Sequence, residues 1–386
     1  MIDVLLAQTR EVDDVEAALR EVLALLNLGQ RLKKNSVGLL SCANAFLESG
    51  AVKAICERLP FPVVGINSLL NSTSLGALDA ALLSLAVLTS DEIHFAAGLS
   101  EPLEPECRGA VIDAYLETER LLASRPALAI VQAPALASIA VGEKIARVFD
   151  EVSDSVPLFG SQAADYSTYL RAPQVIYNGE AFSDCLAMVL IEGRVQPRFD
   201  VFPVSPHKAI HQKAIVTASQ GNVLMEVNGV PVLEYMESLG LCWYGHISGT
   251  HCIPIFLDRG DGNPPTARTI HSQTPEGHIV LCGDAPIDTT LGIGSLSPED
   301  VLSTAAAVGQ KAKFLRPNAL VMYSCLSRNI ALGLDYMAEI ETLQRHLEGC
   351  VPYLFSYSSG EFCPVTRQDG RSHNEYHNMS LVTLSL

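Results

Sequence analysis

One short pattern occurs three times in this chain and limits what it can fold into. Each copy has an apolar stretch with a small or polar exit, a helix-length stretch, and then a proline, two bulky residues and a turn. The copies run from 37–42 to 62–68, from 127–132 to 157–163, and from 320–325 to 352–358. The pattern predicts a strand, a crossover and a second strand, and therefore an α/β fold with repeated β-α-β units. Ligands of open α/β sheets usually bind at the loops that leave the carboxyl ends of such strands.

Chain length and proline spacing predict how the repeats are grouped. A chain of 386 residues exceeds a comfortable single core. Pro197, Pro203 and Pro206 lie close together near the middle, and such clusters break periodic structure. We therefore expect two fused halves, 1–200 and 201–386, each with a mixed β-sheet flanked by helices.

Apolar periodicity and turn residues predict several further elements. Helices are expected at 13–28, 107–123 and 298–314, since apolar residues recur there at helical spacing or follow helix-start residues. A hairpin is expected over 214–227, because two apolar runs flank a Ser-Gln-Gly-Asn turn. The last residues, 381–384, read as a closing strand.

Charge and hydropathy disfavour two classes of partner. The formal net charge of −17 repels phosphate backbones and anionic membrane surfaces, so we expect no nucleic-acid partner. The longest apolar stretch, 75–88, contains Asp79 and is too short to span a bilayer, and the amino terminus has no signal-peptide pattern. We expect a soluble cytoplasmic protein without a membrane partner. The segment 291–294 lacks the third glycine of a dinucleotide fingerprint, and no cofactor is expected.

Ten cysteines and ten histidines raise the question of a metal site. The cysteines are scattered without a CxxC spacing, which favours free, buried thiols over metal ligands. His207 and His211 are four residues apart, but the segment lacks the Glu of HExxH. His246 and His251 lie near Cys252, and we expect packing or solvent-facing histidines there. No metal site is predicted.

The loops after the third copy of the pattern carry the densest set of polar residues. The candidate ligand-binding residues there are Ser324, Cys325, Arg328, Ser359, Gly360 and Glu361. A guanidinium pairs with a carboxylate and a carboxylate with an ammonium, so Arg328 and Glu361 suit an amphoteric ligand. The alternative is an Arg–Glu pair that merely holds two loops together.

A second candidate group follows the second copy. Gly160 and its small neighbours permit close approach of the backbone to a ligand, with Gln162 and Asp165 as polar contacts. The alternative is a tight turn in which Asp165 acts as a cap.

Several of these segments together resemble the FIST family of sensory domains. The resemblance rests on Ser324-Cys325-x-x-Arg328, on Gly360-Glu361, and on the terminal run that begins with His377 and Asn378. The segments 157–165 and 221–231 are similar to further motifs of the family. The order of the motifs covers almost the whole chain, and identifies 1–200 as similar to the FIST N-terminal half and 201–386 as similar to the C-terminal half.

The resemblance implies a ligand-sensing module of signal transduction. Such a module is expected to bind a small metabolite, such as an amino acid or a related acid, and to relay the signal through a protein partner. It adds His377 and Asn378 to the candidate ligand contacts. The segment 65–70 departs from the family pattern Gly-Cys-Ser/Thr-x-Gly-Glu, which puts a pocket in the first half in doubt.

Two other functions remain open from the sequence. Cys325 lies at a strand exit, where a thiol nucleophile with His346 or His377 as base would make a thiol-dependent enzyme. A small buried cysteine is the alternative for that residue. The second open function is that of a protein-binding scaffold. Its oligomeric state is not indicated.

Overall fold

Three tandem repeats build most of the molecule. The computed structural model describes residues 1–136, 141–154, 156–164, 173–205, 207, 209, 211–241, 252–367 and 370–386. The first repeat consists of β1 (Asp3–Thr9), α1 (Val15–Leu26), α2 (Leu28–Arg31), β2 (Asn35–Cys42), α3 (Asn44–Glu48), α4 (Ala51–Cys56), β3 (Val63–Asn67), β4 (Asn71–Thr73) and β5 (Leu83–Ser90).

The other two repeats follow the same order of elements. The second consists of β6 (His94–Leu99), α5 (Cys107–Glu119), β7 (Leu128–Ala133), α6 (Val141–Ser153), β8 (Leu158–Gln162), β9 (Val175–Tyr177), β10 (Glu180–Phe182) and β11 (Ala187–Glu192). The third consists of β12 (Arg198–Phe202), α8 (Pro298–Leu315), β21 (Leu320–Cys325), α9 (Leu326–Leu332), the 3-10 helix η4 (Gly333–Asp335), α10 (Ala338–Leu347), β22 (Tyr353–Ser358), β23 (Glu361–Thr366), β24 (Ser372–His377) and β25 (Leu381–Ser385).

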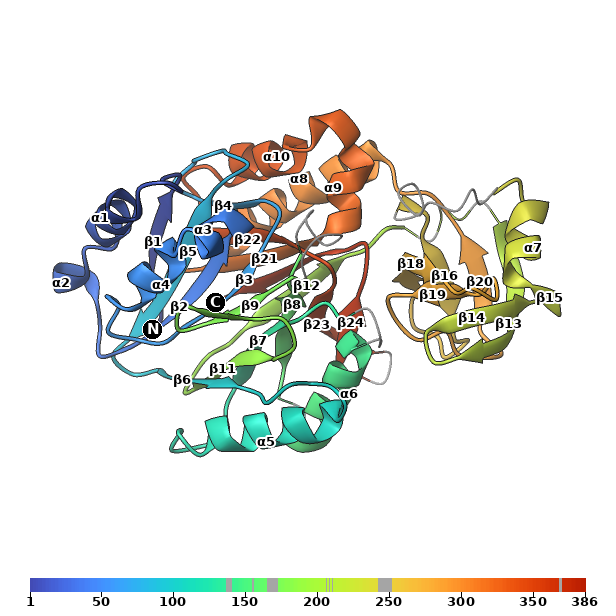
Figure 1. Cartoon of the computed structure of the whole chain (residues 1–386), viewed down its shortest axis with the longest axis horizontal. Coiled ribbons are helices and arrows are strands. Elements are labelled where there is room, and N and C mark those ends of the chain that lie inside the picture. Colours follow the sequence, from blue (N-terminus) through green and yellow to red (C-terminus); the bar gives the residue numbers. More distant parts are fainter. Residues whose placement is uncertain are drawn as a thin grey trace.

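The strand pairs predicted from the repeated pattern are confirmed. β2 and β3, β7 and β8, and β21 and β22 each pair in parallel across a helical crossover. In each repeat the first strand pairs antiparallel with the last, as β1 does with β5, β6 with β11, and β12 with β25. The expected α/β class, with mixed sheets flanked by helices, is therefore confirmed (Figure 1).

The repeats exchange strands in a ring. β4 of the first repeat pairs with β22 of the third, β9 of the second pairs with β3 of the first, and β23 of the third pairs with β8 of the second. The three sheets enclose one apolar core, to which Leu39, Ile130, Phe159, Val321 and Leu354 belong. Helices pack on the outer faces of the sheets (Figure 1). Through this exchange, each repeat contributes a strand to the sheet of another repeat.

A β-rich insert interrupts the third repeat between β12 and α8. It consists of β13 (His211–Gln220), β14 (Val223–Val227), β15 (Val230–Pro231), α7 (Val232–Ser238), β16 (Ile255–Asp258), β17 (Thr266–Arg268), β18 (Ile270–Gln273), β19 (Ile279–Leu281) and β20 (Thr290–Ile293). These strands form a sheet with its own apolar core around Val216, Leu224 and Leu291. The insert lies at one end of the molecule (Figure 1). The expected division into 1–200 and 201–386 stays a prediction.

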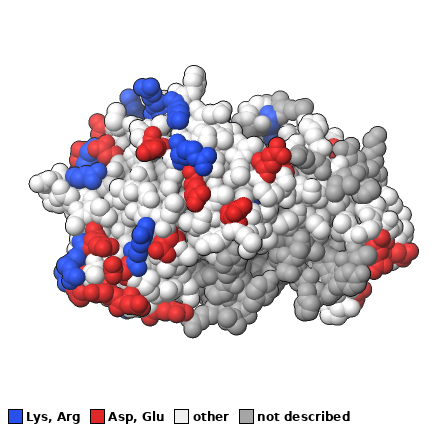
Figure 2. All heavy atoms as spheres, turned by 90° about the horizontal axis from the view of Figure 1, so that it is seen from above, with Lys and Arg blue, Asp and Glu red and all other residues white. Residues whose placement is uncertain are grey.

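Local signals explain why the predicted helices and hairpin form. The expected helices appear as α1, α5 and α8, and the hairpin as β13 with β14. The Ser297 hydroxyl accepts a hydrogen bond from the Asp300 amide at the start of α8, and Pro298 occupies its first turn. Among the described residues, no helix has the length and apolarity needed to cross a bilayer. On the face shown in Figure 2, basic side chains lie among acidic ones.

Candidate functional site

The structure brings most of the predicted site residues together where β8 meets β23. The Gln162 amide donates to the Gly360 carbonyl at 2.8 Å, and the Ser359 amide donates to the Gln162 carbonyl at 3.1 Å. The Ser359 hydroxyl donates to the Ala163 carbonyl at 2.7 Å. Gly160 pairs with Phe362 in the same ladder. The second and third repeats are therefore joined by the loops that the sequence marks as candidates.

Glu361 lies at the centre of this junction and is fully buried. The Ser358 hydroxyl donates to one carboxyl oxygen at 2.6 Å, and the Ser380 hydroxyl donates to the other at 2.8 Å. Burial raises the pKa of Glu361 to about 8, despite these hydrogen bonds and the Arg328 charge, which lower it. At neutral pH the group is therefore mostly a protonated carboxylic acid.

Arg328 is also buried, but its partner is Glu339 on α10. The Arg328 guanidinium donates to Glu339 through Nη2 at 2.6 Å and through Nε at 3.1 Å, and to the Thr304 hydroxyl at 2.7 Å. Ser324 donates to the same carboxylate at 3.0 Å. Arg328 has a side-chain exposure of 1%, and Glu339 of 0%. An Arg–Glu pair does hold elements together here, but it joins α9 to α10.

The remaining predicted residues fill the space around this junction. His377 Nε2 lies 2.9 Å from the Cys363 carbonyl, and the Asn378 side chain donates to the His377 carbonyl at 3.0 Å. The Cys325 thiol is buried, and burial raises its pKa, so the thiol form dominates at neutral pH. Asp165 lies outside the described residues, as do His246 and His251. The junction groups thus mainly bind one another.

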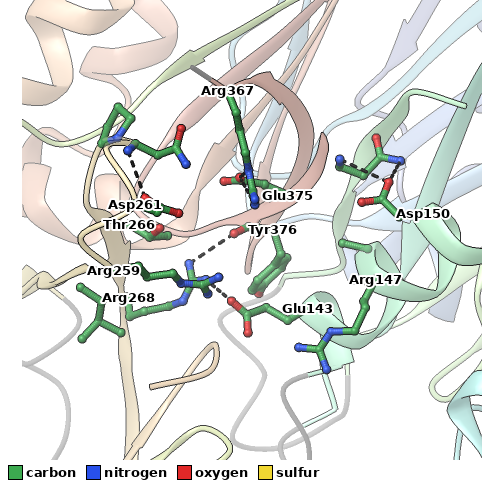
Figure 3. Close-up of a pocket in the computed structure, with 15 residues that line it drawn as sticks. Glu143, Arg147, Asp150, Arg259, Asp261, Thr266, Arg268, Arg367, Glu375 and Tyr376 are labelled. Carbon is green, nitrogen blue, oxygen red and sulfur yellow. Dashed lines mark hydrogen bonds and ion pairs between the residues drawn. The ribbon is translucent and has the colours of Figure 1, made fainter. Parts of the chain in front are cut away.

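A cavity of about 180 Å³ lies between the insert and the second repeat (Figure 3). It was not predicted from the sequence. Its walls come from α6, from the β16–β17 hairpin of the insert, and from the segment around β24. Charged side chains of both signs line it, namely Glu143, Arg147, Asp150, Arg259, Asp261, Arg268, Arg367 and Glu375.

Two side chains of α6 make polar contacts with the described residues of the insert: Arg147, through an ion pair with Asp284 at 3.0 Å, and the more deeply buried Glu143. Glu143 accepts hydrogen bonds from the Arg268 guanidinium and, at 2.8 Å, from the Asp284 amide. Burial raises the pKa of Glu143, but the Arg268 charge and the Asp284 amide outweigh it and leave the pKa below its usual value. Arg268 also donates to the Tyr376 carbonyl at 3.2 Å. The contacts of Arg268 with Glu143 and with Tyr376 form one wall of the cavity (Figure 3).

Most of the other charges in the cavity wall already have protein partners. Arg367 pairs with Glu375 at 3.0 Å, and Asp150 accepts from the Asn374 side chain at 2.8 Å. Arg259 is exposed and forms no ion pair with another described residue. The pKa of Asp261 is lowered mainly by its hydrogen bond from the Asn263 amide, and the Arg367 and Arg259 charges add to this effect. Arg259 is therefore the cavity guanidinium that is most available to a ligand.

The match to known families decides what kind of protein this is. The FIST N domain matches residues 36–230, and the FIST C domain matches residues 245–364. The chain belongs to the FIST family. FIST domains are sensory domains of signalling proteins, so this chain has a sensing role in signal transduction. No curated protein sequence matches the chain.

The cavity draws on both FIST domains. Arg147 and Asp150 lie in the FIST N match, while Arg259 and Asp261 lie in the FIST C match. The sequence did contain a signal for the second pair, since residues 258–265 form a polar loop rich in Gly and Pro with alternating charge. The signal was insufficient, because only the fold brings this loop next to α6.

Proposed function

We propose that the chain senses a small zwitterionic metabolite, such as an amino acid or a related acid, and passes the signal to a protein partner. The observation that carries this proposal is the cavity between the insert and the second repeat, where guanidinium and carboxylate groups line the same space. A guanidinium binds a ligand carboxylate, and a carboxylate binds an ammonium group. The volume of about 180 Å³ limits the occupant to a small molecule.

The roles within the cavity follow from which groups are already paired. Arg259 would bind the ligand carboxylate, because Arg268 and Arg367 are each paired with a glutamate and Arg147 is paired with an aspartate, Asp284. Asp261 accepts one amide hydrogen bond, from Asn263 at 3.0 Å, and keeps further acceptor sites for an ammonium group. Few apolar side chains line the cavity, so a polar ligand side chain is favoured.

The test is a thermal-shift screen against the amino acids and related carboxylic acids, with calorimetry on each hit. A ligand at 100 times its dissociation constant adds about 2.7 kcal/mol of stability. Loss of one charge-assisted hydrogen bond costs about 1.5–3 kcal/mol, so Arg259→Gln should weaken each hit by about tenfold or more. Arg198→Gln, on the exposed edge of β12, makes the same charge change away from the cavity and should bind normally.

Two results would contradict the proposal. One is a screen without hits, and the other is a hit that binds Arg259→Gln as tightly as the parent chain. The placement expected from the sequence, around Glu361, is separated by Glu361→Gln. If that variant loses the ligand while Arg259→Gln retains it, the ligand binds at the junction of the repeats instead.

A further inference from the structure

The insert contacts the rest of the molecule in two different ways. Toward the third repeat the side chains of Phe256 and Ala267 of the insert pack in an apolar cluster with Val301, Leu332 and Met379, and the hydrogen bond from Arg268 to the Tyr376 carbonyl lies beside it. Toward the second repeat the contact around Glu143 is polar and charged. A small, polar interface between parts of a chain permits relative motion, whereas an apolar one resists it.

We propose that the insert is a hinged clamp that turns about its apolar contact and latches onto α6 through Glu143. In the latched state Glu143 binds both the Arg268 guanidinium and the Asp284 amide, which lie on separate segments of the insert. Closure by a ligand rests on the proposed function, because that ligand would occupy the cavity beside the latch.

The latch is suited to two states of similar free energy. Arg268 has a side-chain exposure of 3%, and Glu143 of 10%, so closing removes both charges from water. The desolvation cost of such a pair offsets most of its attraction, which leaves the closed state only weakly favoured. A modest additional interaction would therefore shift the balance between open and closed states.

A ligand in the cavity supplies such an interaction, because the cavity has walls on both sides of the hinge. Arg259 and Asp261 belong to the insert, whereas Arg147 and Asp150 belong to α6. A molecule that contacts both pairs binds the closed state more tightly than the open one, and so stabilises closure. The position of the insert would then report the ligand to a partner.

Hydrogen exchange tests the latch in the ligand-free chain. Glu143→Gln removes the charge that holds Arg268, so the amide of Asp284 and the β17 segment should exchange at least threefold faster. Glu151→Gln, an exposed position on the same helix, should leave both unchanged. Exchange in β21 and β22 should stay as in the parent, which distinguishes opening of the insert from general loss of stability. Unchanged exchange in the β17 segment, which carries Arg268, in Glu143→Gln would overturn the latch, whereas Asp284 also keeps its ion pair with Arg147.

A second variant tests the latch from the side of the insert, and hydrogen exchange with a bound amino acid tests closure by the ligand. Arg268→Gln should open the same segments, and the double variant should add little, because both residues act in one contact. Amino-acid hits from the screen should slow exchange in both α6 and the 258–268 segment. A hit that slows exchange in neither segment would show that the ligand binds at another place in the molecule, and would overturn closure of the insert by the ligand. If no amino acid binds, ligand control falls with the proposed function, while the Glu143 variants still decide the latch.

Discussion

Glu361 shows what the fold does to a single carboxyl group. Its pKa is about 8 in the folded chain against an ordinary value of 4.5, so between these values the folded state holds the extra proton. The free energy of unfolding should therefore fall as the pH rises through this window, by up to about 1.4 kcal/mol per pH unit from this group. The contribution is fully present below pH 4.5 and is lost as the pH passes 8.

Glu361→Gln tests this expectation, because an amide resembles the protonated acid in shape and stays uncharged. Denaturant unfolding at pH 6 and pH 9 should show a smaller loss of stability in the variant than in the parent chain. The exposed Glu151→Gln serves as the control and should follow the parent. Parallel pH profiles for the parent and Glu361→Gln would show that Glu361 does not titrate in this range.

Gly142 allows α6 to pack closely against β24. It lies on α6, where an added Cβ would overlap the ring of Tyr376 on β24. Alanine favours a helix by about 1 kcal/mol over glycine, but the clash should outweigh this gain. We expect Gly142→Ala to lower stability by about 1–3 kcal/mol in denaturant unfolding.

Gly29 provides the matched control for this helix substitution. It lies in α2, and an added Cβ would meet no heavy atom within 4 Å. Gly29→Ala should therefore be neutral or slightly stabilising. Equal effects of the two substitutions would mean that α6 moves away from β24 without cost.

At the level of elements, the sequence was most informative where patterns were local. The parallel pairs, α1, α8 and the β13–β14 hairpin follow from apolar spacing and caps within one segment. The exchange of β4, β9 and β23 did not follow, since a three- to six-residue strand carries no information about which sheet it joins. The partner of Arg328 was also missed, because Glu339 lies eleven residues away on a separate helix, α10. The cavity was not predicted because its walls come from three segments that are distant from one another in the sequence.

The whole molecule should unfold its three repeats together. Each repeat's sheet contains a strand from another repeat, so no sheet can be lost without breaking a second one. Hydrogen exchange in a denaturant series should therefore show β3, β8 and β22 losing protection at one denaturant concentration. Loss of protection in the first repeat well before the other two would contradict this. Because the insert has its own apolar core, its loss of protection provides an internal comparison with that of the three repeats.

The position of the insert shows where this scaffold accepts an additional domain. The insert occupies the connection between the first strand and the first helix of its repeat, and the pairing of β12 with β25 persists around it. The corresponding connections in the other repeats are residues 10–14 and 100–106. Both link a strand to a helix on the outside of a sheet, so they are the natural positions at which to engineer a reporter domain into this scaffold.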